Sequence, residues 1–195
     1  MSNTIEFPAC SFQLPGWVQT VVQPGQLLAT EAERLSLAIE LSNQQVAHKT
    51  GGPFGAIVCE MDTGKVVGAG VNLVVPTHMS IAHAEVVAWS VTQAYLGTFD
   101  LGADTQPTLG IYASAQPCIA CWGGMFWTGI KHLAYAATKE DVETVAGFDE
   151  GPMPDDWEAR LQQRGITVSH DLRAPAVAVL AAYRKAGGEL YNASN

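Results

Sequence analysis

The sequence has few basic side chains and no run of them. Ten Lys and Arg stand against 19 Asp and Glu, which gives a formal net charge of −9 at pH 7. Such a charge repels phosphate backbones, so we expect no nucleic-acid partner. The first thirty residues contain no Lys or Arg, which argues against an ordinary secretory signal and leads us to expect a cytoplasmic protein.

A long apolar run is also missing. The longest, at 174–183, is about half the ~20 residues that a membrane-spanning helix needs, so we expect no membrane partner. The sequence contains no internal repeat and no low-complexity segment. Apolar residues still make up 48% of the 195 residues and charged residues only 15%, a composition typical of folded proteins. We therefore predict one domain, 1–195, with a sizeable core.

The expected elements alternate between helices and strands after an irregular lead at 1–25, where Pro and Gly recur. Thr30 and Glu33 form a capping box that begins a helix ending near residue 47. Five further segments are predicted strands, at 54–59, 65–74, 109–113, 131–137 and 166–169. Five more are predicted helices, at 83–96, 118–127, 156–163 and 174–185, with a short one from 138. This alternation predicts an α/β domain with helices on both faces of a sheet, and the turn at 62–64 predicts a hairpin between the first two strands.

Two short motifs carry metal-binding side chains: His83-Ala84-Glu85, and Pro-Cys-Ile-Ala-Cys at 117–121. Each begins a predicted helix, and residues three apart on a helix share a face, so Cys118 and Cys121 point to one site. The helix N-terminus lowers a thiol's pKa and favours the thiolate that binds metal. Two thiolates and the His83 imidazole leave the fourth tetrahedral position of zinc open for water, as in catalytic sites. We therefore predict one catalytic Zn²⁺ per chain.

Glu85 follows the expected ligand His83 by two residues, close enough to face a zinc-bound water, whose pKa falls to ~7. Its expected work is to take a proton from that water and deliver it to a ring nitrogen and then to the departing amine. Alone, His83 would be a structural histidine, and Cys-x-x-Cys a redox pair or half of a structural zinc site. The two motifs in this order are typical of zinc-dependent nucleobase deaminases.

Together the motifs resemble those of the cytidine and deoxycytidylate deaminase superfamily, over roughly 51–150. The resemblance implies a three-layer α/β/α sandwich around a five-stranded mixed sheet. The Gly-Gly-Pro-Phe-Gly segment at 51–55 and Asn72 are similar to the loop and asparagine that line the pocket of the base deaminases. One departure is Gln116, where many relatives have Glu before Pro-Cys; because it is not a ligand, we expect an effect only on hydrogen bonds around the site.

Within the superfamily, the segment at 147–150 resembles guanine deaminases, in which an acidic side chain reaches the guanine. This resemblance implies Glu150 as the second catalytic carboxylate, with Asp149 as the alternative. The tail at 187–195, which includes Tyr191-Asn192-Ala193, resembles a tail that crosses to the partner subunit and closes its active site. The resemblance therefore implies a homodimer with exchanged tails.

The chemistry of guanine agrees with these residues. Its N1–H and 2-amino groups are donors that a carboxylate can accept, and its carbonyl is an acceptor that the Asn72 amide can satisfy. We predict a hydrolytic deaminase that converts guanine to xanthine and ammonia. The residues expected to bind substrate are Asn72, Phe54, Ala84, Asp149 and Tyr191.

Other interpretations stay open at this point. Residues 149–150 could form no more than a solvated acidic turn, and Asn72 could have only a structural role at the end of a strand. The substrate could be another small aminated ring (ammeline, cytosine or a purine nucleoside) or the adenosine of a tRNA. The chain could also be a non-catalytic binding protein that zinc stabilises. Core packing is the default expectation for Trp122, Trp127 and the ring of Phe54, and packing roles are expected for Cys10 and Cys59.

Overall fold

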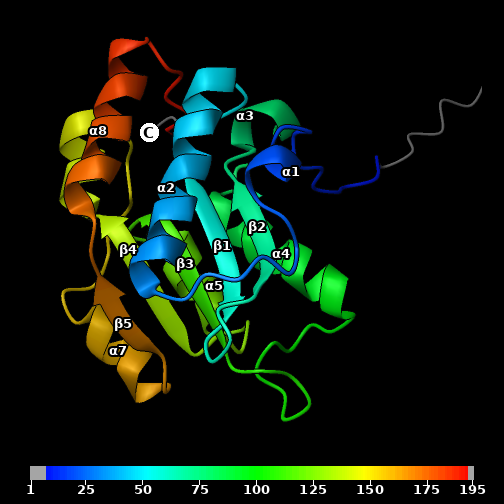
Figure 1. The fold of residues 1–195 in the computed structure, drawn as a ribbon. Helices are drawn as coiled ribbons and strands as arrows, with labels where there is room; N and C mark the ends of the chain where they lie inside the picture. The colour runs from blue at the N-terminus through cyan, green and yellow to red at the C-terminus, as the bar shows by residue number, and fades with distance from the viewer. Residues whose placement is uncertain (1–7, 193–195) are drawn as a thin grey trace, which may run out of the picture.

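Five strands form one mixed sheet in the computed structural model, which describes residues 8–192 (Figure 1). The strands are β1 (Gly55–Glu60), β2 (Val66–Val71), β3 (Leu109–Ala115), β4 (His132–Ala137) and β5 (Thr167–His170). Their order is β2-β1-β3-β4-β5. β1 pairs antiparallel with both β2 and β3, whereas β3, β4 and β5 are parallel. The predicted hairpin and the five-stranded mixed sheet are confirmed.

Helices cover both faces of this sheet. They are α1 (Val18–Val21), α2 (Glu31–His48), α3 (Val74–Thr77), α4 (Ala84–Leu96), α5 (Ile119–Met125), α6 (Lys139–Asp141), the π-helical turn η1 (Val142–Ala146), α7 (Trp157–Gln163) and α8 (Arg173–Lys185). α2 and α8 lie side by side on one face, and α4 and α5 lie on the other (Figure 1). The three-layer α/β/α architecture is therefore confirmed.

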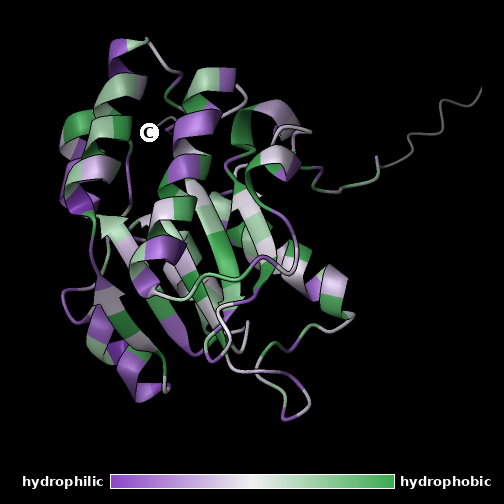
Figure 2. Cartoon of the chain, in the orientation of Figure 1, coloured by the Kyte–Doolittle hydropathy of each residue, from purple (hydrophilic) through white to green (hydrophobic). Residues whose placement is uncertain are grey.

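The sequence signals for the longer helices act as expected. Thr30 accepts a hydrogen bond from the Glu33 N–H and the Glu33 carboxylate accepts one from the Thr30 N–H, so the capping box is complete. α4 ends at Gly97, which takes a left-handed conformation. Every residue of β2, β3 and β4 is buried, because helices cover both faces. Figure 2 shows apolar residues along the strands and polar residues on the outer sides of α2 and α8.

Several local predictions are corrected. The lead is not wholly irregular, because α1 forms one helical turn within it, and the second strand ends at Val71 since α3 begins at Val74. The ring of Trp127 is 85% exposed and does not pack in the core. Cys10 is exposed too, whereas Cys59 is buried as predicted. Within 8–192, no helix is both long enough and apolar enough to span a membrane.

Candidate active site

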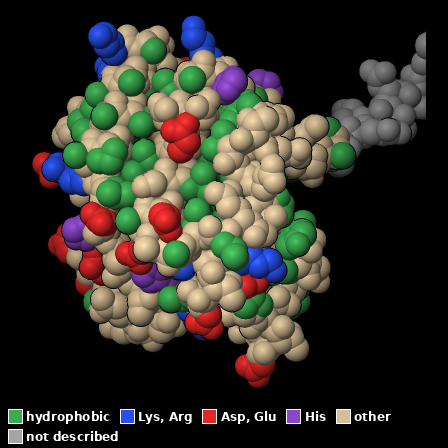
Figure 3. All heavy atoms as spheres, viewed as in Figure 1, with side chains coloured by type: hydrophobic (Ala, Val, Ile, Leu, Met, Phe, Trp, Pro, Cys, Tyr) green, Lys and Arg blue, Asp and Glu red, His purple; other side chains and the backbone are tan. Residues whose placement is uncertain are grey.

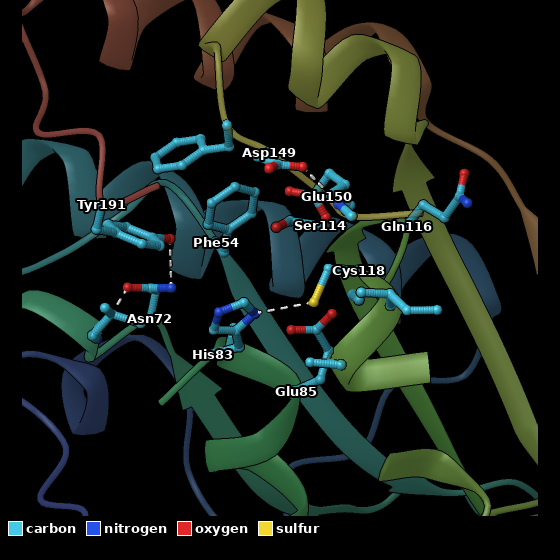
Figure 4. Close-up of a pocket in the computed structure, with 18 of the residues that line it drawn as sticks. Phe54, Asn72, His83, Glu85, Ser114, Gln116, Cys118, Asp149, Glu150 and Tyr191 are labelled. Atoms are coloured by element: carbon cyan, nitrogen blue, oxygen red, sulfur yellow. Dashed lines mark hydrogen bonds between the residues drawn. The ribbon is translucent and has the colours of Figure 1, made fainter. Parts of the chain in front are cut away.

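A pocket opens at the edge of the sheet where β1 begins and β2 and β3 end. The N-termini of α4 and α5 form one side of it, and loops distant from each other in the sequence form the other. Figure 4 shows His83, Glu85 and Cys118 together on the first side, Tyr191 and Glu150 across the pocket from Glu85, and Asn72 next to Tyr191 at the side of His83. All ten residues predicted as metal-binding, catalytic or substrate-binding lie here; Cys121 is the one among them that does not line the pocket, since it is buried beneath it.

Three of these residues form what we call the metal cluster: His83, Cys118 and Cys121. Their ligand atoms lie within 4.8 Å of one another, and this is the one such group of three or more His, Cys, Asp or Glu found in the described part of the chain. His83 Nδ1 lies 3.4 Å from Cys118 Sγ and 3.5 Å from Cys121 Sγ. Nitrogen and sulfur ligands in a tetrahedral zinc shell, at ~2.0–2.3 Å from the ion, are ~3.5 Å apart. The cluster therefore fits zinc in both donor chemistry and spacing.

The helix starts explain why these side chains converge. His83 and Cys118 are the N-cap residues of α4 and α5, and both have extended backbone conformations. Cys121 is in the first turn of α5 and is fully buried. The partial positive charge of both helix N-termini therefore faces the cluster, which favours the thiolate form of the cysteines.

The charges of the cluster are coupled. A hydrogen bond from Cys121 and the neighbouring His83 lower the pKa of the Cys118 thiol to about 4. Burial disfavours a charged imidazole, but the Cys118 thiolate outweighs it and raises the pKa of His83 to about 9. One negative charge is thus already favoured at this position, and a bound cation would favour the second thiolate as well.

Glu85 lies in the first turn of α4, and Figure 4 shows its carboxylate beside Cys118. The side chain is buried. Burial, and then the charge of Cys118, raise its pKa to about 7. A carboxyl group with a pKa near neutrality can both take up and release a proton at physiological pH, as acid–base catalysis requires.

The opposite side of the pocket, which we call the recognition wall, consists of Asn72, Glu150 and Tyr191. Asn72 follows β2 directly and is almost fully buried. Its Oδ1 accepts a hydrogen bond from the Val74 N–H at 3.2 Å, and its Nδ2 donates to Tyr191 Oη at 2.7 Å. A backbone N–H can only donate, so the atom facing Val74 must be oxygen. The N–H groups of Asn72 therefore face Tyr191 and the pocket.

Glu150 is the carboxylate of the 147–150 segment that faces the cluster side. Its side chain is buried. The backbone carbonyl of Glu150 accepts a hydrogen bond from the Ile119 N–H at 3.1 Å, which ties this residue to the start of α5. Burial, followed by the charges of Cys118 and Glu85, raises its pKa to about 8, and a cation bound in the metal cluster would favour the charged carboxylate again. Asp149 is exposed instead, and its Oδ1 accepts a hydrogen bond from the Gly151 N–H at 2.9 Å within the turn. The geometry thus favours Glu150 over Asp149 for contact with a ligand.

Aromatic rings close the pocket between the two sides. Phe148 packs edge-on against Phe54 with ring centroids 5.2 Å apart, and its centroid lies 4.8 Å from that of Tyr191. Phe54 thus lines the pocket as predicted, although its ring also packs against the core. The role of Phe148 was missed, although it lies inside the 147–150 segment that the resemblance had singled out. Such rings suit a flat heterocycle.

Other lining residues were placed less accurately by the sequence. Ser114 was not predicted; it is buried, and its Oγ accepts a hydrogen bond from the Gly55 N–H at 3.1 Å. Gln116 points away from the cluster (Figure 4), and its Oε1 accepts from the Lys139 N–H at 3.1 Å. The presence of Gln at this position, where many relatives have Glu, therefore changes a hydrogen bond at the start of α6 and leaves the metal cluster unaffected. Trp122 packs against the core as predicted, without lining the pocket.

Comparison with known proteins agrees with this geometry. A family model described as the cytidine and deoxycytidylate deaminase zinc-binding region matches residues 29–137. The chain belongs to this family. The resemblance predicted from its motifs is therefore confirmed.

Relatives within the family include guanine deaminases. Guanine deaminase from Bacillus subtilis (strain 168) is 34% identical over 116 residues, which are 60% of this chain and 69% of that protein. A solved structure of guanine deaminase from Nitrosomonas europaea has a TM-score of 0.87 and 40% identity, covering 93% of this chain and 100% of the other. A structure solved with 2,6-diaminopurine has a TM-score of 0.87 and 42% identity, covering 93% and 96%.

Proposed function

We propose that this protein hydrolyses guanine to xanthine and ammonia, using one zinc ion per chain held by His83, Cys118 and Cys121. The observation that carries the proposal is the position of Glu150, a second buried carboxylate that shares one pocket with Glu85 and the metal cluster. The similarity to guanine deaminases over nearly the whole chain supports the choice of substrate.

Glu85 would perform the proton transfers. Zinc, when bound, supplies the Lewis acid that activates a water molecule. The Glu85 carboxylate takes a proton from the attacking water and delivers it to the ring nitrogen next to C2. It then takes the proton of the hydroxyl now bonded to C2 and transfers it to the 2-amino group, so that the C2–N bond breaks as ammonia leaves and the C2–O bond becomes the carbonyl of xanthine.

The recognition wall would orient the base. The Glu150 carboxylate is suited to accept hydrogen bonds from N1–H and the 2-amino group, and the N–H groups of Asn72 are suited to donate to the carbonyl. Phe54 and Phe148 would flank the ring, and the backbone of Ala84 would border it at the start of α4. We propose Asp149 only for the turn that holds Glu150 in place.

The tail is proposed to complete the site. Tyr191 and Asn192 line the pocket, and Asn192 Oδ1 accepts a hydrogen bond from the Asp149 N–H at 3.0 Å. In this single chain the tail reaches the chain's own pocket, while Ala193 and the end of the tail lie outside the described residues. In a homodimer with exchanged tails, the tail of the partner would fill the same position. The exchange of tails therefore stays a prediction. A chain truncated after Gly187 should keep its fold and lose activity; unchanged turnover would contradict this role.

We infer a cytoplasmic protein that acts on a free base. The metal cluster needs reduced thiols, and all four cysteines are free, which suits a reducing compartment. The net charge of −9 opposes nucleic-acid binding. On the face drawn in Figure 3, Lys and Arg side chains stand apart from one another and form no continuous basic patch. These features make tRNA a poor substrate.

An ammonia-release assay on the zinc-loaded protein tests the proposal. The panel is guanine, ammeline, cytosine, adenine, cytidine and guanosine. We expect turnover of guanine and little of cytosine or the nucleosides. Turnover of another member alone would keep the zinc chemistry and reject the assigned roles of Asn72 and Glu150. No turnover of any member, with zinc bound, would instead support a non-catalytic role.

A further inference from the structure

Hydrogen bonds hold both the backbone and the side chain of Asn72. Its backbone N–H donates to the Phe54 carbonyl at 3.1 Å, and its side chain is fixed by Val74 and Tyr191. Its backbone carbonyl accepts a hydrogen bond from Gln45 Nε2. Gln45, which does not line the pocket, thus anchors the peptide group from which the Asn72 side chain projects.

Gln45 lies near the end of α2 and is fully buried. Thr50 Oγ1 donates a hydrogen bond to its Oε1 at 2.6 Å, and Trp17 Nε1 donates to the same Thr50 Oγ1 at 3.1 Å. Because the backbone carbonyl oxygen of Asn72 can only accept, Nε2 must be the group that faces Asn72. A buried amide with both ends satisfied has one orientation and holds its partner firmly.

The loop beside this bond is shaped to admit it. A Cβ atom at Gly51 would overlap both the Asn72 carbonyl oxygen and Gln45 Nε2. At Gly52 a Cβ atom would overlap the hydroxyl of Tyr191. The two glycines of the Gly-Gly-Pro-Phe-Gly segment thus leave room for the two residues that fix Asn72, which gives a physical reason for glycine at each position.

We propose that Gln45 is a positioning residue for base recognition, which aims the free N–H of Asn72 at an acceptor on the substrate. The Asn72 amide has two N–H groups, of which one is used by Tyr191. The other is left for the carbonyl oxygen of guanine. The inference rests on the proposed role of Asn72 and explains selectivity for a ring with an acceptor at this position.

A pair of ligands separates this role from a purely structural one. 8-Azaguanine keeps the 6-carbonyl of guanine, whereas 2,6-diaminopurine replaces it with an amino group that has no acceptor for Asn72. Dissociation constants for both are measured on the full-length, zinc-loaded protein carrying Glu85→Gln, so that neither is turned over. Gln45→Met is then added, with Gln44→Met as the matched control, because among residues 8–192 the Gln44 amide bonds only to Glu40 on the same helix.

We expect Gln45→Met to weaken 8-azaguanine binding about tenfold, the effect of misplacing one hydrogen-bond donor, and to change 2,6-diaminopurine binding by less than about twofold. Gln44→Met should change neither. Equal weakening of both ligands, or no weakening of either, would overturn the inference. Should Gln45→Met fail to fold, Thr50→Val provides the second variant, with a loss of about threefold expected for 8-azaguanine alone.

The outcome also separates this inference from the proposed function. A wild-type protein that releases no ammonia from guanine, but whose preference for 8-azaguanine depends on Gln45, would overturn the function and keep the inference. Guanine turnover with a ligand preference that Gln45→Met leaves intact would do the reverse. Binding of neither ligand would overturn both.

Discussion

The metal cluster and the recognition wall face each other across one pocket but come from different parts of the chain. His83 and Cys121 are 38 residues apart and lie at the starts of two neighbouring helices. Asn72 and Tyr191 are 119 residues apart and lie outside any strand or helix. The first side is fixed by short motifs and helix ends, and the second by long-range contacts between loops. We infer that the first side determines the reaction and the second determines which base reacts.

The largest expected effect is on the side of the metal cluster. Glu85→Gln keeps the shape of the side chain but removes the group that moves protons, so turnover of guanine should fall by at least ~10²–10⁴-fold. Because Glu85 is not a ligand, the zinc content measured by metal analysis should stay that of the wild type. A variant with full activity would contradict the assigned chemistry.

Glu150→Gln tests the wall in the same way. The amide cannot accept from both guanine donors as a carboxylate does, and hydrogen bonds to charged groups contribute ~1.5–3 kcal/mol, so kcat/KM should fall ~10–100-fold. Asp149→Asn is the matched control, since that side chain is exposed and serves the turn. Equal losses of kcat/KM in the two variants would contradict the assignment of substrate contact to Glu150 and of a turn role to Asp149.

A smaller effect is expected for Tyr191→Phe. The change removes the hydroxyl that accepts from Asn72 and keeps the ring against Phe148. One neutral hydrogen bond contributes ~0.5–1.5 kcal/mol, which corresponds to a ~2–10-fold loss in kcat/KM for guanine. The loss should appear in KM, because the bond orients the base and takes no part in proton transfer. A change confined to kcat would place Tyr191 in the chemistry instead.

The smallest effect on activity is expected for an ion pair behind the recognition wall, between Arg173 and Asp141. This ion pair also has a defined pH dependence. Arg173 on α8 donates to the carboxylate of Asp141, the last residue of α6, in the segment that leads to Glu150. Arg173 lowers the pKa of Asp141 below its ordinary value of 3.8. A carboxyl group whose pKa is lowered by folding stabilises the fold above that range and loses this contribution as the pH falls through its folded-state pKa.

Asp141→Asn should therefore lower the melting temperature by a few degrees at pH 7, while guanine turnover changes little. The difference from the wild type should persist at pH 5 and shrink below pH ~3.8. Thermal unfolding measured across this range checks the prediction. A difference that grows toward acid pH would contradict the role assigned to this ion pair.

The sequence predicted one side of the pocket better than the other for a physical reason. Residue spacing along a helix determines how Cys118 and Cys121 point, so the cluster could be inferred from their neighbours alone. The capping box at Thr30 and the alternation of elements likewise act locally and placed the helices and strands within a few residues. The sequence also contained the signal for Asn72 and Glu150, but only through resemblance to a family.

What the sequence did not reveal depends on contacts between distant segments. No local pattern connects Gln45 to Asn72, or Phe148 to Tyr191, because those pairs meet only when α2, β2 and the tail are packed together. The exposure of Trp127 was mispredicted for a related reason. An aromatic residue is assigned to the core by its type, whereas its actual position follows from where α5 ends.

The structure of the zinc-loaded Glu85→Gln variant with guanine bound is the measurement that tests the division of the pocket most directly. We predict zinc on His83, Cys118 and Cys121, with C2 of guanine facing it. The Glu150 carboxylate should accept from N1–H and the 2-amino group, and Asn72 should donate to the carbonyl. Guanine bound with its carbonyl toward the cluster, or without contact to Glu150 and Asn72, would contradict the account.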